Sequence, residues 1–88
     1  MDDSIRQYAA QARRFKLTIV PRDPKRPAVT DYYPNYQSWS AAVESGIIAF
    51  GDPLYHEYDT DTGVEKFGFR NAALDLWLFT NDPSAGKE

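Results

Sequence analysis

Apolar and polar residues alternate over residues 15–20, which read Phe-Lys-Leu-Thr-Ile-Val. A period of two combined with β-branched residues predicts a strand that turns one face towards a core. Pro21 is expected to end this strand, because proline has no amide hydrogen to donate to a sheet.

A β-hairpin is the clearest local feature of the sequence. Residues 54–59 and 64–70 are separated by Thr60-Asp61-Thr62-Gly63. These residue types are favoured in hairpin turns, because Asp and Thr side chains bond to the turn backbone and glycine accepts a positive φ. We therefore expect two antiparallel strands here, with Gly68 marking a bulge in the second.

Helical periodicity marks two other segments. Residues 3–14 carry an apolar stripe at the spacing of one helix face, formed by Ile5, Tyr8, Ala9 and Ala12. Residues 36–45 are expected to form a second helix between an Asn35 N-cap and Gly46, with a buried stripe of Tyr36, Trp39 and Val43. The short apolar run at residues 47–50 then predicts a buried strand.

The segment 72–80 fits two structures. Asn71 and the alanines that follow it favour a helix. The same residues also alternate as a strand would, with Leu74, Leu76 and Leu78 on one side and Asp75, Trp77 and Phe79 on the other. The N-cap residue favours a helix for this segment, and a strand is the alternative.

Together these elements predict one small α+β domain over residues 1–83, followed by a flexible tail at residues 84–88. We expect two or three helices to cover one face of an antiparallel sheet of about four strands. The expected core comprises Ile5, Leu17, Ile19, Val43, Ile47, Phe50, Phe67, Leu74 and Trp77.

Composition excludes several classes of protein. The chain has no cysteine, so disulfides and thiolate metal sites are ruled out. Its longest apolar run, Gly46–Gly51, is far shorter than the ~20 residues of a membrane-spanning helix. No secretory-signal pattern opens the chain, and we therefore expect a cytoplasmic protein that does not associate with membranes.

Candidate chemistry is sparse. The single histidine, His56, would need a nucleophile and an orienting group beside it, and its neighbour Glu57 points to the opposite face of a strand. The carboxylates of residues 57–61 match no register of a calcium-binding loop. No glycine pattern of a phosphate-binding loop occurs. We expect a protein that is not an enzyme and that has neither a metal site nor a cofactor.

Charge is distributed unevenly along the chain, whose net charge is −3. Residues 1–26 carry seven basic groups and three acidic ones, whereas residues 27–88 carry three basic groups and ten acidic ones. Three prolines, Pro21, Pro24 and Pro27, recur at the polyproline II period, which predicts an exposed, extended loop. Its basic residues are Arg22, Lys25 and Arg26.

Aromatic residues make up 15% of the chain, and six of them are tyrosines. So small a core cannot enclose them all, and exposed tyrosines beside arginines are typical of protein-binding surfaces. The sequence thus favours a protein–protein interaction module, such as a small inhibitor or adaptor. The residues expected to bind the partner are Arg22, Lys25, Arg26, Tyr32, Tyr33, Tyr55 and Tyr58.

The alternative is a nucleic-acid-binding protein that uses the basic segment 13–26 with neighbouring aromatic residues. A sequence pI near 5.0 weighs against this alternative, because such domains usually carry a basic excess. The sequence leaves the identity of the partner and the oligomeric state open.

Overall fold

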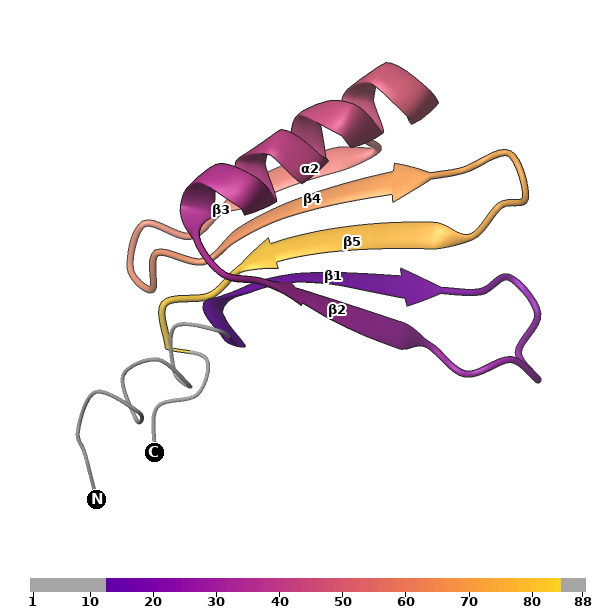
Figure 1. Cartoon of the computed structure of the whole chain (residues 1–88), viewed down its shortest axis with the longest axis horizontal. Helices are drawn as coiled ribbons and strands as arrows, with labels where there is room; N and C mark the ends of the chain where they lie inside the picture. The colour runs from indigo at the N-terminus through magenta and orange to yellow at the C-terminus, as the bar shows by residue number, and fades with distance from the viewer. Residues whose placement is uncertain (1–12, 85–88) are drawn as a thin grey trace.

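A computed structural model gives the fold of residues 13–84 (Figure 1). The predicted helix at residues 3–14 therefore falls almost wholly outside the described residues. Six elements follow one another along the chain: β1 (Phe15–Val20), β2 (Val29–Tyr33), α2 (Tyr36–Phe50), β3 (Tyr55–Tyr58), β4 (Glu65–Arg70) and β5 (Leu76–Asn81).

The five strands form one antiparallel sheet in the order β2-β1-β5-β4-β3. Its last strand in sequence, β5, is the central one in space. β5 pairs with β1 on one side, where Leu17 lies opposite Phe79, and with β4 on the other, where Phe67 lies opposite the same residue. The β1–β2 hairpin and the β3–β4 hairpin are thus joined only through β5.

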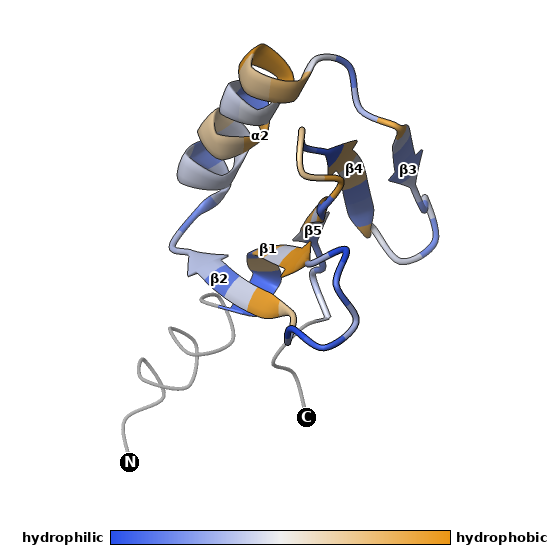
Figure 2. Ribbon diagram, turned by 90° about the vertical axis from the view of Figure 1, so that its right-hand side faces the viewer, coloured by the Kyte–Doolittle hydropathy of each residue, from blue (hydrophilic) through white to orange (hydrophobic). Residues whose placement is uncertain are grey.

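Helix α2 packs on one face of this curved sheet (Figure 2). Its N-terminus is capped by Asn35, whose side-chain oxygen accepts from the Ser38 amide at 2.9 Å. Trp39, Val43 and Gly46 are the buried residues of the helix, and their spacing places them on one side of it. Gly46 lies against the sheet, where a Cβ would be 3.5 Å from the ring of Phe79, an ordinary van der Waals distance.

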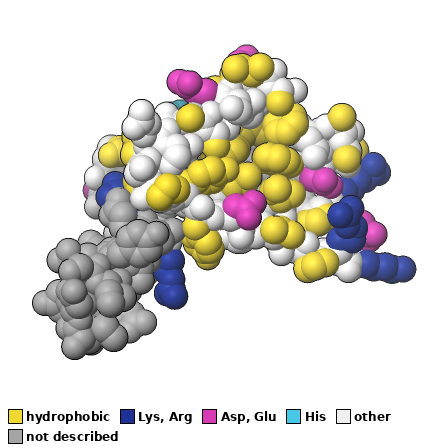
Figure 3. Space-filling model, in the orientation of Figure 1, with side chains coloured by type: hydrophobic (Ala, Val, Ile, Leu, Met, Phe, Trp, Pro, Cys, Tyr) yellow, Lys and Arg dark blue, Asp and Glu magenta, His cyan; other side chains and the backbone are white. Residues whose placement is uncertain are grey.

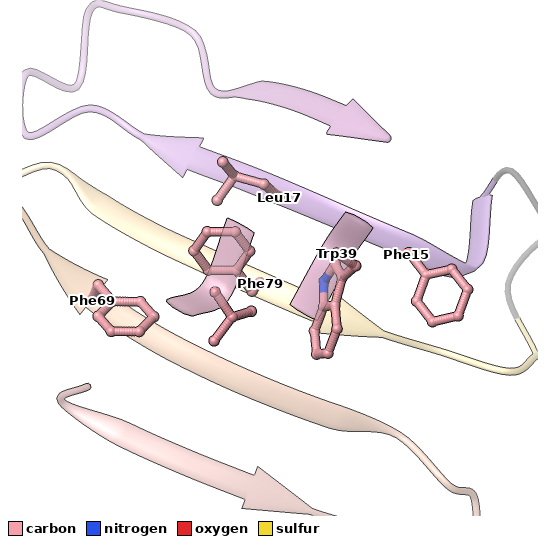
Figure 4. Close-up of a cluster of buried hydrophobic side chains, with 6 residues drawn as sticks. Phe15, Leu17, Trp39, Phe69 and Phe79 are labelled. Carbon is pink, nitrogen blue, oxygen red and sulfur yellow. The ribbon is translucent and has the colours of Figure 1, made fainter. Parts of the chain in front are cut away.

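The hydrophobic core lies between α2 and the middle of the sheet (Figure 4). Phe69 and Phe79 meet edge to face, with ring centroids 5.8 Å apart. The Trp39 indole is buried, and its N–H donates to the Lys16 carbonyl at 3.2 Å, which satisfies the one polar atom of that side chain. The buried core consists of Phe15, Leu17, Trp39, Val43, Phe69 and Phe79.

These observations confirm the α+β class, the strand at residues 15–20, the hairpin and the Asn35 cap. The expected count of four strands and two or three helices is wrong in detail, because residues 13–84 form five strands and one helix. Two of the five strands were not among those expected: β5, for which a helix was favoured, and β2, for which no element was predicted. β2 was hidden in a polar and aromatic stretch that lacks a clear alternation.

Two assignments near the helices are corrected. Residues 47–50 are the last turn of α2 rather than a strand, because the helix continues through Gly46 and ends at Gly51, whose φ is 86°. Segment 72–80 is not a helix. Its second half belongs to β5, which places Trp77 and Phe79 on the helix side of the sheet.

Three smaller expectations also fail. Gly68 makes no bulge, since β4 pairs in continuous register with both of its neighbours. The proline-rich loop is not a regular polyproline helix, because the Arg26 amide bonds to the Asp23 carbonyl at 3.1 Å and closes a turn. Three residues expected to be buried are exposed, namely Tyr36, Ile47 and Leu74.

Leu74 adopts a left-handed backbone conformation, with a φ of 68°, in the exposed turn before β5. A side chain at such a φ costs about 1–2 kcal/mol, whereas glycine adopts it freely but loses more entropy on folding. Leu74→Gly should therefore raise the free energy of unfolding by about 0.5–1 kcal/mol. Urea denaturation measures this change.

Ala73→Gly is the matched control, since Ala73 precedes Leu74 in the same turn and has no positive φ. This control should leave stability unchanged or lower it. A Leu74→Gly variant that is less stable than the wild type would show that the Leu74 side chain contributes more than its backbone costs.

Candidate protein-binding groove

An apolar groove of about 370 Å³ lies between α2 and the sheet. In Figure 3 it is part of a band of hydrophobic side chains that faces the viewer, below the helix. Its lining residues come from α2, β2 and β5: Tyr33, Ala42, Ser45, Gly46, Ala49, Phe50, Trp77 and Phe79.

The groove exists because α2 is narrower than the sheet. Five strands about 4.8 Å apart span about 19 Å, whereas a helix with its side chains is about 10 Å across. On the same face β2 stays open to solvent, with Val29 53% exposed. The groove thus follows from the width of the sheet.

Small residues form the wall of the groove on the helix side. Ala42, Ser45 and Ala49 follow one another at intervals of one turn along α2. Because these side chains are short, the wall is low and the groove stays open to solvent beside it. Ala49 is itself exposed, which places it at the mouth of the groove.

Aromatic side chains form the floor and the far end. Phe50 closes the end near the C-terminus of α2, where its ring lies 5.0 Å from that of Trp77. Within residues 13–84, the Trp77 indole nitrogen is the one buried side-chain nitrogen or oxygen without a hydrogen-bond partner. A buried donor left without an acceptor costs about 1–3 kcal/mol.

Charged groups stand at the rim. Asp31 lies on the same face of β2 as Tyr33, two residues away. Burial, and then the charge of Asp31, raises the pKa of the Tyr33 hydroxyl above its usual value. Asp31 therefore gives the β2 side of the groove a negative group.

The basic loop stands at one end of the sheet. Arg22, Lys25 and Arg26 lie between β1 and β2, at the end where Ile19 pairs with Trp77. The Arg22 amide donates to Asp75 at 3.0 Å, and this bond lowers the pKa of that carboxyl. The bond ties the loop to the turn before β5, so its basic side chains stay near the Trp77 end of the groove.

The four tyrosines expected to bind a partner do not form one patch. Strand register places Tyr32 and Tyr55 on the face away from α2, and Tyr33 and Tyr58 on the helix side. Tyr32 and Tyr58 are 55% and 60% exposed, while Tyr33 is half-buried in the groove. Of the four, only Tyr33 lines the groove.

The sheet face away from α2 has a different character. Register places Lys16, Lys66 and Arg70 on it, with Glu57 as the acidic strand residue. The Tyr55 ring lies directly over Gly68, because a Cβ there would come within about 3 Å of three ring atoms. The open face thus combines basic side chains with an exposed ring that lies on the backbone.

His56 is held by hairpin contacts on edge strand β3. Its ring stacks on Phe67, with centroids 4.1 Å apart, and its Nε2 lies 3.2 Å from Glu65 Oε2. The Asp59 carboxylate accepts hydrogen bonds from two amides of the β3–β4 turn, so its role in the turn accounts for an aspartate at this position. Among residues 13–84, no three His, Asp or Glu side chains gather as metal ligands would.

Sequence reasoning missed most of the residues that line the groove. Trp77 and Phe50 were expected to be core, Ala49 was expected in a buried strand, and Phe79 was placed only in the strand alternative for residues 72–80. The alternation of residues 76–79 was noted but given less weight than the Asn71 cap, and it places Trp77 and Phe79 on the helix side of the sheet.

Within residues 13–84, no helix has both the length and the apolar character needed to cross a membrane. No protein-family model matches the chain, and no similar protein is found among curated proteins or among solved structures.

Proposed function

We propose that this protein is a non-enzymatic protein-binding module that holds an apolar segment of a partner in the groove between α2 and β2. The observation that carries the proposal is an open, aromatic-floored groove with Trp77 at its base. Tryptophan, tyrosine and arginine dominate binding energies at protein interfaces, and the groove and its rim contain all three. An inhibitor or an adaptor would both act through such a surface.

The size and shape of the groove favour side chains of a protein over a small metabolite. Its volume of about 370 Å³ lies near the lower end of the range for ligand sites, about 300–1,000 Å³. It is open along one side, so it would not enclose a small molecule. Each apolar side chain of a partner that is buried there contributes about 1.5–3 kcal/mol.

Ala49→Arg tests this proposal, because an arginine at the mouth would fill the groove and place a charge beside its apolar floor. Proteins retained from source-cell lysate by the immobilised wild type are identified and then titrated in purified form. For a partner that uses the groove, Ala49→Arg should weaken the affinity by about 10-fold or more, or about 1.4 kcal/mol.

Ala41→Arg is the matched control, since Ala41 is exposed on α2 and does not line the groove. It should bind the partner as the wild type does, and circular dichroism should show the same helix content in both variants. A partner that binds Ala49→Arg and the wild type equally would place the binding surface elsewhere and refute the proposal.

A nucleic-acid-binding role is the second candidate, supported by the Tyr55 ring on Gly68. On β4, Lys66 and Arg70 flank that glycine on the same face, so a stacking surface lies between two cations. The basic segment 13–26 does not supply one cluster, because β1 separates Arg14 from the loop that begins after Val20. This second role would therefore belong to the open face of the sheet.

For this role, Tyr55→Ala should weaken binding of a single-stranded oligonucleotide by roughly 5-fold or more, since stacking on one base contributes about 1–3 kcal/mol. Tyr58→Ala, on the opposite face, is the control and should change nothing. Fluorescence anisotropy at low salt gives both affinities. Absence of binding by the wild type, or binding that does not weaken with added salt, would dismiss this candidate.

A further inference from the structure

We infer that edge strand β2 is matched to pair with β2 of a second copy of this chain, and that the charge of Asp31 opposes this pairing. The inference concerns self-association and does not depend on what the groove binds. Three features of β2 lead to it: the direction of its outer backbone groups, the order of its residues, and the position of its one charge.

Strand β2 lies at one edge of the sheet and directs backbone groups away from it (Figure 1). The Asp82 amide donates to the carbonyl of Arg14, the residue before β1, at 2.8 Å, so Arg14 bonds towards β5. Because backbone groups alternate in direction along an antiparallel strand, the odd-numbered residues of β1 bond towards β2. The register then points the N–H and C=O groups of Thr30 and Tyr32 outwards, and both residues are exposed.

The residues of β2 are ordered so that the strand complements itself. They read Val-Thr-Asp-Tyr-Tyr, which is two β-branched residues, an aspartate and two tyrosines. Antiparallel pairing of two copies about Asp31 sets Val29 opposite Tyr33 of the second copy, and Thr30 opposite its Tyr32. Each of these pairs occurs twice around the two-fold axis. Cross-strand pairs of a β-branched and an aromatic residue stabilise sheets, so every pair except the central one is favourable.

Pairing about Asp31 is also the register that uses the whole strand. The outward backbone groups of Thr30 meet those of Tyr32 in the second copy, and the reverse, so all of them are matched. Pairing about Thr30 or about Tyr32 would leave two residues of each β2 without a strand residue opposite. Pairing about Tyr32 would also set Thr30 opposite Pro34, which has no amide hydrogen.

Asp31 is the one unfavourable position in this interface. Its carboxylate would face that of the second copy across the two-fold axis. Because Asp31 directs its own backbone groups towards β1, the two residues would form a non-hydrogen-bonded pair, whose Cα atoms lie only about 4.5 Å apart. Like charges directly opposite each other destabilise a sheet. Asp31 is exposed and forms no ion pair with any residue in the range 13–84, so its charge stands at the centre of an otherwise matched edge.

The other edge of the sheet is formed by β3, which has four residues. Its outward backbone groups belong to His56 and Tyr58, because Asp59 bonds towards β4. Pairing of two β3 strands through these groups would set Glu57 opposite itself. A variant that lacks only the Asp31 charge should therefore form a closed dimer through β2 rather than a longer assembly.

Sedimentation velocity of the full chain at several concentrations tests the inference. Asp31→Asn removes the charge and keeps the shape of the side chain, so its dimer dissociation constant should be about 10-fold or more below that of the wild type. Asp61→Asn is the matched control, since it removes the same charge from the β3–β4 turn at the other side of the sheet. It should self-associate as the wild type does. Equal self-association of the two variants would overturn the inference.

A charge exchange tests the register. Asp31→Lys alone should stay monomeric, because lysine would face lysine. An equimolar mixture of Asp31→Lys and the wild type should form a heterodimer, since lysine and aspartate then lie opposite each other, and added salt should weaken it. Asp61→Lys mixed with the wild type is the control and should not form one.

The mixtures are followed by sedimentation with one chain fluorescently labelled, and circular dichroism checks that each variant is folded. A mixture of Asp31→Lys and the wild type that stays monomeric would overturn the inference. Dimers of Asp31→Lys alone would do the same. An equally strong heterodimer with Asp61→Lys would assign the attraction to net charge rather than to β2, which would also overturn it.

Discussion

A helix of fifteen residues covers a sheet of five strands within residues 13–84, and this mismatch of widths governs the surface of the molecule. The core closes where Trp39 and Val43 meet the phenyl rings of the central strands. Beyond that contact the edge strand β2 stays largely exposed on the same face, with Val29 53% exposed. The apolar groove is the part of the core that α2 does not close.

β5 is the central strand, and its alternating side chains supply apolar residues to both faces of the sheet. A central strand is apolar on both faces, and β5 places Trp77 and Phe79 towards the helix and Leu78 on the open side. The two faces of the sheet then differ in charge. Asp31 and Glu65 lie on the helix side, whereas Lys16, Lys66 and Arg70 lie on the open side. Because side chains alternate along each strand, Asp31 and Glu65 face the helix side of the sheet, and the three basic strand residues face the opposite side.

Features that depend on neighbouring residues could be predicted from the sequence. Three of these features are found: the alternation of residues 15–20, the hairpin turn at residues 60–63 and the Asn35 cap. Each depends only on a few consecutive residues. Features that depend on distant residues could not be predicted. Gly46 resembles a helix stop, but the helix continues through it and buries it against the sheet beside Phe69 and Phe79.

The candidate site was predicted less well than the fold. Tyrosines and the basic loop stand out in composition, but strand register divides the tyrosines between two faces and leaves Tyr33 alone in the groove. The groove depends on β5 being a strand, and the local pattern of residues 72–80 also fits a helix. Small residues such as Ala49 carry no signal until their place on α2 is known.

Solvent access to the alanine methyl groups of α2 tests the central claim most directly. With a soluble gadolinium relaxation agent, the methyl of Ala49 should relax nearly as fast as that of exposed Ala41, while the methyls of Val43 stay protected. An Ala49 methyl as protected as those of Val43 would show that the groove is closed in solution and would contradict the account.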